Sequence, residues 1–153
     1  VRFNFLHNYI QYLILYIVVM KAPKILNNSY APGKHVLLDF WGAQKITELG
    51  FVEKALIEVA TQCKATILET KMHSFGEGGG ITGVVILAES HISIHTWPEI
   101  DFCAIDVFMC GSCDAANAIE PLKKLFNPDK ELDSTILVHS KHSPYSNLNT
   151  KYV

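Results

Sequence analysis

An eleven-residue stretch holds most of the side chains in this sequence that could do chemistry. Residues 89–99, E-S-H-I-S-I-H-T-W-P-E, contain two histidines, two carboxylates, three hydroxyls and a tryptophan. The stretch therefore marks a candidate site.

The same stretch has the two-residue period of a β-strand. His91, Ser93 and His95 alternate with Ile92 and Ile94, so the polar side chains share one face and the isoleucines take the other. This pattern predicts a strand that buries its isoleucines and presents polar groups as one wall of a site. The alternative is a half-solvated strand with chance histidines, because any antiparallel strand alternates in this way.

Cys110 and Cys113 form a C-x-x-C pair a little further on. A redox pair of this kind belongs to a thioredoxin-like context, in which the motif follows the first buried strand, whereas here it lies late in the chain. A zinc site would need two further ligands, for which His91 and His95 are available at a spacing that is not a strong zinc signature. Zinc binding remains an alternative, and so does a Cys113 with no role at a helix start.

Residues 73–80, H-S-F-G-E-G-G-G, form a glycine-rich loop. A phosphate-binding P-loop would continue with Gly-Lys-Ser/Thr into a helix, but this loop has neither feature and precedes a predicted strand. A mobile loop over a site is the simpler interpretation.

Length and composition indicate one globular domain with a sizeable core. The chain has 153 residues, of which 49% are hydrophobic and 18% charged. The net charge of −2 and the single arginine, Arg2, give no electrostatic case for nucleic acid or an anionic membrane. Four cysteines are too few for a disulfide scaffold, so we expect reduced thiols and a cytoplasmic protein.

The N-terminal residues differ in composition from the rest of the chain. Residues 9–20 are apolar but span about a dozen positions, fewer than the roughly 20 that a membrane-crossing helix needs. The residues that follow offer no small-x-small cleavage site of a secretory signal. We expect residues 1–19 to be a mis-assigned or dispensable extension and residues 20–153 to form the domain; a weak membrane anchor is the alternative.

Periodicity predicts the elements that must hold the site. Steps of three and four at Leu49, Val52, Leu56, Val59 and Cys63 predict an amphipathic helix over 46–63. A second helix follows Cys113, with Ser112 or Asp114 as its cap and a kink at Pro121. Besides the central strand, strands are predicted at 35–41, 65–72, 83–88, 102–109 and 135–139. Asp39 in the first of these is either exposed on one strand face or a half-buried carboxylate with a structural role, and we favour the structural role.

This order of elements predicts an α+β two-layer sandwich, an antiparallel sheet with two helices on one face. Such a sandwich leaves the second sheet face open and partly apolar. A second copy of the chain is the simplest cover for that face, so we expect dimerisation sheet to sheet.

A longer pattern resembles a known family. The string from Glu89 to Glu99, followed by D-V-F-M-C-G at 106–111 and preceded by G-I-T-G-V-V at 80–85 and G-K-H-V-L-L-D at 33–39, is similar to the bacterial and archaeal S-adenosylmethionine decarboxylase proenzymes. The resemblance runs from about residue 33 to residue 128, and a match of this length with so many rare residues is not a chance event.

The resemblance implies that the chain makes its own cofactor. In this family the hydroxyl at the position of Ser90 attacks the carbonyl of Glu89, and the resulting ester eliminates to leave a pyruvoyl group. The cleavage would give a β chain of residues 1–89 and an α chain of residues 90–153. His95 matches the proton acceptor of this processing. Thr82 stands where the family usually has serine, and it keeps the hydroxyl while adding a methyl and stiffening χ1.

The resemblance also implies the reaction and its substrate. The pyruvoyl group would form a Schiff base with S-adenosylmethionine and act as the electron sink for decarboxylation. Cys110 matches the proton donor, and an ordinary thiol is protonated at neutral pH. Phe75 and Trp97 are candidates to flank the adenine, and Glu99 to accept the ribose hydroxyls. The product would donate aminopropyl groups to spermidine and other polyamines, and the working unit would be a dimer of αβ units.

Three alternatives to this function remain at this point. The scaffold could decarboxylate another amino acid such as arginine, as some relatives do. The chain could be a homologue that does not process itself and acts as a binding or regulatory subunit. It could also be a zinc-binding module that uses Cys110, Cys113 and a histidine.

Overall fold

The computed structural model describes residues 33–138 of the chain. The predicted extension at 1–19 lies outside the described residues, as does the predicted start of the domain at residue 20, and both stay predictions. The elements are β1 (Gly33–Trp41), α2 (Leu49–Gln62), β2 (Ile67–Ser74), β3 (Ile81–Leu87), β4 (Ser90–Trp97), β5 (Phe102–Cys110), α3 (Ile119–Phe126) and β6 (Lys130–Val138), with short 3-10 turns η1 (Pro98–Ile100) and η2 (Ala115–Ala118).

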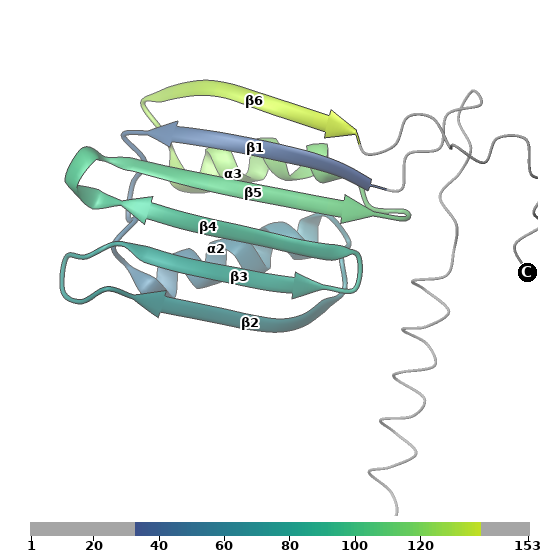
Figure 1. Ribbon diagram of the computed structural model, residues 1–153, viewed down its shortest axis with the longest axis horizontal. Coiled ribbons are helices and arrows are strands. Elements are labelled where there is room, and N and C mark those ends of the chain that lie inside the picture. The colour runs from purple at the N-terminus through teal and green to yellow at the C-terminus, as the bar shows by residue number, and fades with distance from the viewer. Residues whose placement is uncertain (1–32, 139–153) are drawn as a thin grey trace, which may run out of the picture.

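The strands form one antiparallel sheet with the order β2-β3-β4-β5-β1-β6. Helices α2 and α3 both lie behind this sheet in Figure 1, so one sheet face is covered and the other is open. The predicted α+β two-layer sandwich is therefore confirmed, with the predicted order of strands and helices. The strand that carries the candidate site, β4, lies in the interior of the sheet between β3 and β5.

The core lies between the sheet and the two helices. Alternate residues of the strands point into it, and in β4 these are Ile92, Ile94 and Thr96. The buried hydroxyl of Thr96 accepts a hydrogen bond from the Ile81 amide and donates one to the Ile46 carbonyl. No polar atom is therefore left without a partner at this position, and the ends of β3 and β4 are tied to the segment before α2.

The first helix is shorter than predicted. It begins at Leu49 and not at Ile46, because Ile46 is buried in a turn whose carbonyl bonds to Thr96. The predicted apolar stripe is buried except at its start, where Leu49 is 39% exposed. The prediction that Cys63 belongs to the core is confirmed, since its side chain is 5% exposed.

The second helix was predicted with a kink at Pro121, and this prediction was wrong. A 3-10 turn over Ala115–Ala118 comes first, and α3 begins only at Ile119. Pro121 therefore lies in the first turn of the helix, where a backbone N–H has no partner within the helix, so the proline costs no hydrogen bond. The predicted cap at Asp114 is confirmed, because its carboxylate accepts from the Ala116 amide at 2.9 Å.

The glycine-rich loop connects β2 to β3. At its end, Gly80 passes so close to β4 that a Cβ there would lie 2.3 Å from the Thr96 carbonyl oxygen. Only glycine allows this approach, so at this position the glycine has a packing reason and no link to phosphate binding.

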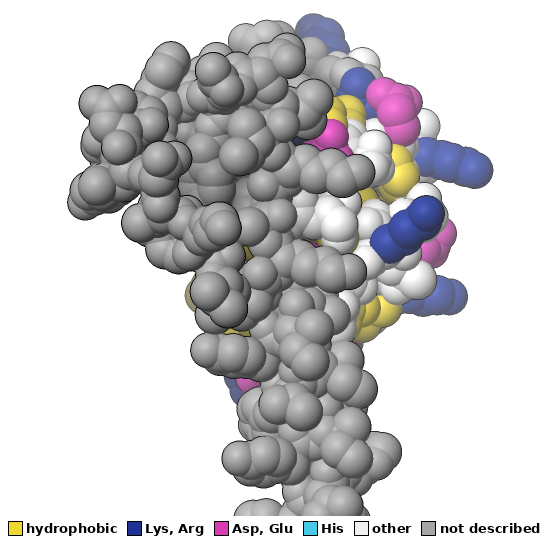
Figure 2. All heavy atoms as spheres, turned by 90° about the vertical axis from the view of Figure 1, so that its right-hand side faces the viewer, with side chains coloured by type: hydrophobic (Ala, Val, Ile, Leu, Met, Phe, Trp, Pro, Cys, Tyr) yellow, Lys and Arg dark blue, Asp and Glu magenta, His cyan; other side chains and the backbone are white. Residues whose placement is uncertain are grey.

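The part of the described surface that is visible in Figure 2 carries charges of both signs. Seen from the side in Figure 2, lysines and carboxylates occur together on the described atoms, with hydrophobic side chains between them. Within residues 33–138, no helix is long and apolar enough to cross a membrane.

Two leucines of α2 provide a matched test of this packing. Leu56 is fully buried, whereas Leu49 is 39% exposed on the same helix. Leu56→Ala should lower the free energy of unfolding by about 2–5 kcal/mol because it leaves a cavity. Leu49→Ala should lower it by less than about 1 kcal/mol. Denaturant unfolding of both variants measures the difference, and equal losses would contradict the packing of α2 on the sheet.

Candidate active site

The junction between Glu89 and Ser90 is conformationally unusual. A two-residue turn, Ala88–Glu89, links β3 to β4, and Ser90 begins β4 with a φ of 141°. A side chain other than glycine rarely adopts such an angle, and the neighbours of the residue must hold it there. The strain lies in the backbone of Ser90, directly after the peptide bond that joins it to Glu89.

Both sides of this junction are held in place. The buried carboxylate of Glu89 accepts hydrogen bonds from the Thr66 amide at 2.8 Å and from the Thr66 hydroxyl at 3.2 Å. The carbonyl oxygen of Glu89 accepts a hydrogen bond from the amide of Cys110 at 3.0 Å. A donor at this position polarises the carbonyl and would stabilise negative charge on its oxygen if a nucleophile added to the carbon.

Cys110 ends β5 beside the junction. Burial, together with the negative charge of Glu89, raises the pKa of its thiol above the ordinary value, so the thiol stays protonated at neutral pH. The loop after it is anchored, because Lys34 on β1 makes a two-oxygen ion pair with Asp114 at 2.7 and 2.8 Å. The thiol therefore lies at a fixed position at the end of β5 and can supply a proton next to the Glu89–Ser90 junction.

His91 is the histidine closest to the Ser90 hydroxyl along β4. Its Nδ1 lies 3.2 Å from the Ser90 Oγ, within hydrogen-bonding distance. Its ring also lies near a His35–Asp106 ion pair that joins β1 to β5. One ligating atom from each of His35, His91 and Asp106 lies within 4.8 Å of the other two.

These three residues are the set that could hold a metal ion among the described residues. Two imidazoles and a carboxylate suit a first-row transition metal. Cys110 and Cys113 do not belong to this set, so the geometry gives no support to the zinc module that combines both cysteines with a histidine.

A second group of predicted residues lies toward the other end of β4. Thr82 on β3 is paired directly with His95. The His95 ring lies 4.1 Å from the Trp97 ring and 6.1 Å from the Phe75 ring, measured between centroids. Trp97 in turn stacks on Phe102 at 5.3 Å. Glu99 lies exposed in the adjoining turn η1.

The structure thus divides the predicted site residues into two groups and does not join them within one chain. Glu89, Ser90 and Cys110 meet at one end of β4, whereas Thr82 and His95 pair toward the other end. Five residues of strand separate Ser90 from His95, which corresponds to roughly 16 Å at about 3.3 Å per residue. His95 therefore does not reach Ser90 of its own chain.

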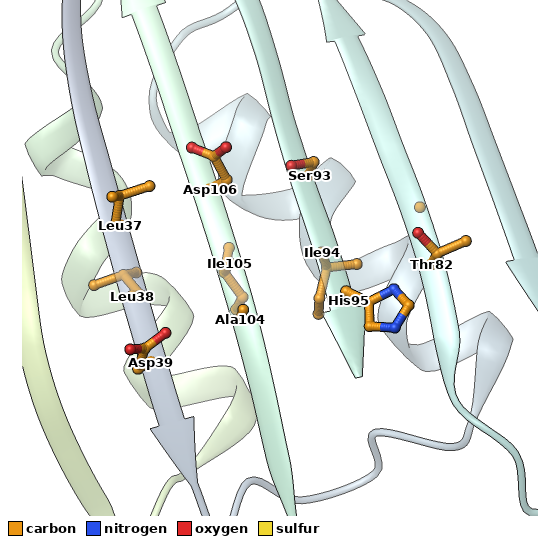
Figure 3. Close-up of a pocket in the computed structure, with 11 residues that line it drawn as sticks. Leu37, Leu38, Asp39, Thr82, Ser93, Ile94, His95, Ala104, Ile105 and Asp106 are labelled. Atoms are coloured by element: carbon orange, nitrogen blue, oxygen red, sulfur yellow. The ribbon is translucent and has the colours of Figure 1, made fainter. Parts of the chain in front are cut away.

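Between the two groups the open face is hollowed. A shallow depression of about 450 Å³ is lined by Thr82, Ser93, His95, Asp39 and Asp106, among others. Figure 3 shows Thr82 beside the ring of His95 on one side of it, and Asp106 and Asp39 on the other. Of the two alternatives for Asp39, the structure shows the exposed position on this strand face and not the half-buried carboxylate that was favoured.

Sequence reasoning missed the neighbours of Ser90. His91 was considered only as a zinc ligand, and neither His35 nor Asp106 was a candidate. The signal lies in the sheet register, in which His91 faces Phe108 and Phe108 faces His35. That register follows from the pairing of three strands that are distant in sequence, so local spacing does not reveal it.

This two-layer α+β domain places a serine with a strained backbone directly after a polarised carbonyl, an arrangement that favours addition of a nucleophile to that carbonyl. Comparison with known families gives the particular assignment. Residues 34–136 match the family model described as S-adenosylmethionine decarboxylase. The chain belongs to the S-adenosylmethionine decarboxylase family.

Individual relatives agree with this assignment. A protein of Methanococcus vannielii named S-adenosylmethionine decarboxylase proenzyme is 44% identical over 101 residues, which cover 64% of this chain and 82% of the relative. A proenzyme of the same name from Thermomicrobium roseum is 38% identical over 99 residues, covering 64% of this chain and 85% of the relative. The crystal structure of the adenosylmethionine decarboxylase from Aquifex aeolicus aligns with a TM-score of 0.63 and 32% identity over 74% of this chain and 92% of the other.

Proposed function

We propose that this chain is a proenzyme that cleaves itself between Glu89 and Ser90 and then decarboxylates S-adenosylmethionine. The observation that carries the proposal is the junction itself. Ser90 has a strained backbone, its hydroxyl lies 3.2 Å from His91 Nδ1, and the Glu89 carbonyl accepts a hydrogen bond from the Cys110 amide at 3.0 Å. Membership of the family and the proenzyme names of the relatives support the same reaction.

The self-cleavage balances without an outside reagent other than water. The Ser90 Oγ attacks the Glu89 carbonyl carbon, and the peptide C–N bond gives way to an ester. Loss of the Ser90 α-proton then eliminates the ester, and the main-chain carboxylate of Glu89 leaves as the new C-terminus of the β chain. The dehydroalanine that remains at position 90 hydrolyses and releases ammonia. Glu89 stays anchored on Thr66 during these steps.

The product of this cleavage would be a pyruvoyl group at the new N-terminus of the α chain. Such a group supplies an electrophilic carbonyl that draws off the electrons left by carbon dioxide. Cys110 fits beside it, because the raised pKa of the thiol keeps a proton available for the product carbon. The product would be an aminopropyl donor for polyamine synthesis.

A second copy is needed to complete the site. His95 and Thr82 do not reach Ser90 within one chain, yet all three residues match the motif of the family. The open face that carries them also exposes apolar side chains, among them Leu37 (37%), Trp41 (38%) and Ile86 (38%). Two copies that face each other with their β4 strands antiparallel would cover this surface.

That arrangement would bring His95 and Thr82 of one chain to Ser90 of the other. Phe75, Trp97 and Glu99 lie on the His95 side of the sheet, so they would come from the same partner and bind the nucleoside part of the substrate. The site would then lie between two αβ units. A cytoplasmic location with reduced thiols stays a prediction; the four cysteines are free.

Mass spectrometry under denaturing conditions tests the cleavage. The purified chain should appear as two fragments that divide between residues 89 and 90, the second lighter than its serine form by one ammonia. Ser90→Ala should leave one intact chain, because the nucleophile is missing. Thr61→Ala, which removes a hydroxyl on the exposed side of α2, should cleave as the native chain does. An intact native chain would instead favour a homologue that only binds its ligand.

Release of labelled carbon dioxide tests the substrate. The cleaved protein should release it from carboxyl-labelled S-adenosylmethionine and not from labelled arginine, because the aromatic residues beside His95 suit a flat adenine and a sulfonium. Ser90→Ala should release none from either compound. Turnover of arginine alone would contradict the proposed substrate and would support an arginine decarboxylase with the same fold.

Co-expression of two inactive variants tests the shared site. Ser90→Ala and His95→Ala chains carry different tags, and each expressed alone should stay uncleaved. In a mixed dimer, Ser90 of the His95→Ala chain would face an intact His95, so that chain should be cleaved. If His95 acts within its own chain, neither variant has both groups and no cleavage occurs, which would contradict the proposed dimer.

A further inference from the structure

We propose that His91 is the base that activates the Ser90 hydroxyl for self-cleavage, and that Asp106, which is held in place by His35, positions His91 and stabilises its charge. The inference rests on the proposed self-cleavage and adds a residue to it. It concerns the first step only, in which the hydroxyl must lose its proton before its oxygen can attack the Glu89 carbonyl.

The hydrogen bond between Ser90 and His91 carries the argument. Nδ1 of His91 lies 3.2 Å from Oγ of Ser90, at the upper end of the range for a base that takes a proton from a hydroxyl. Bases in a resting site often sit at such distances and come closer during reaction. The neutral tautomer that accepts at Nδ1 carries its own hydrogen on Nε2, so Nδ1 is available as the acceptor.

The two protons of the self-cleavage lie at different places and at different times. The first sits on Oγ of Ser90 and must leave while residues 89 and 90 are still joined as an amide. The second sits on the Ser90 α-carbon and leaves only after the ester has formed. His91 is in contact with the first proton, and His95 lies roughly 16 Å along the strand and belongs to the partner's site. We therefore assign the first proton transfer to His91 and the second to His95.

The surroundings of His91 favour the charge that it would acquire. A proton on its ring makes an imidazolium, and the Asp106 carboxylate lies within 4.8 Å of a His91 ring nitrogen. Asp106 itself is fixed by its ion pair with His35. A carboxylate held near an imidazole stabilises the protonated ring and fixes its orientation, as in serine hydrolases.

The step balances within the chain. His91 takes the proton from Oγ of Ser90 as Oγ bonds to the Glu89 carbonyl carbon, and the Cys110 amide donates to the carbonyl oxygen. The carbon–nitrogen bond then breaks, and the Ser90 nitrogen receives the proton from His91 as it becomes an amine. His91 returns to its neutral form, and the products are the ester and a free amino group.

The cleavage rate of the full chain tests this role, with EDTA present to remove bound metal. Asparagine keeps a hydrogen-bond acceptor near the Nδ1 position but has no basic nitrogen. His91→Asn should therefore fold like the native chain and cleave at least about 100-fold more slowly, the loss expected for a general base. His91→Ala should also be slow, and added imidazole should restore part of its rate in a saturable manner. A His91→Asn chain that cleaves at the native rate would overturn the proposal.

Hydroxylamine identifies the step that is blocked, because it cleaves esters much faster than amides. His91→Asn should accumulate the intact amide, which hydroxylamine leaves uncut. His95→Ala should accumulate the ester, which hydroxylamine cuts between residues 89 and 90. If His91→Asn is cut as readily as His95→Ala, His91 acts after ester formation and the proposal is wrong.

A double-mutant comparison tests Asp106. Asp106→Asn should slow cleavage by about tenfold, because the protonated His91 ring loses the neighbouring negative charge that stabilises it. In the His91→Asn background the same change should have no further effect, because the charge that it stabilises no longer forms. Glu58→Gln, an equivalent change on the exposed side of α2, should leave the rate unchanged. Additive effects of the two site changes would mean that Asp106 acts independently of His91.

The native chain is the control that separates the role of His91 from the self-cleavage on which it rests. If the native chain does not cleave, the self-processing function fails. If it cleaves and His91→Asn cleaves equally fast, only the role of His91 fails.

Discussion

A β-strand keeps residues five positions apart about 16 Å from each other, and this limit governs the whole site. Ser90 begins β4 and His95 lies near its end. No rotation of the side chains closes that gap, so groups that must act on one peptide bond cannot all come from the same strand. The same limit explains why an open, partly apolar sheet face is useful here. A face that packs against its own copy can combine the two ends of β4 without any change of fold.

The strained junction depends on the rigidity around it. A φ of 141° at Ser90 raises the energy of the folded precursor, and this cost must be offset by fixed contacts on each side. The buried Glu89 carboxylate is tied to Thr66, and the Glu89 carbonyl is tied to the end of β5. These contacts fix the Glu89 carbonyl and the Ser90 backbone relative to each other, so the junction is held in one geometry.

Local patterns predicted the elements well, because burial follows the periods of strand and helix. The alternation of His91, Ser93 and His95 with buried isoleucines holds in the structure, and so does the stripe of α2 beyond Leu49. The predicted kink failed because the start of α3 depends on a 3-10 turn that a helical period does not reveal. The family motif assigned roles to Ser90, His95 and Cys110, and these assignments stay predictions. It did not predict that they lie in two groups, or that His35 and Asp106 surround His91, because both facts arise from strand pairing over long sequence distances.

The topology also explains how such a protein could survive cutting its own backbone. Cleavage before Ser90 would assign β1, α2, β2 and β3 to one chain and β4, β5, α3 and β6 to the other. In the sheet, however, β1 lies between β5 and β6, and β3 pairs with β4. Three of the five strand pairings therefore join the two chains, and both helices pack on the shared core. Breaking one peptide bond at a tight turn leaves these contacts in place, so the new N-terminus would stay where the junction had been and next to Cys110.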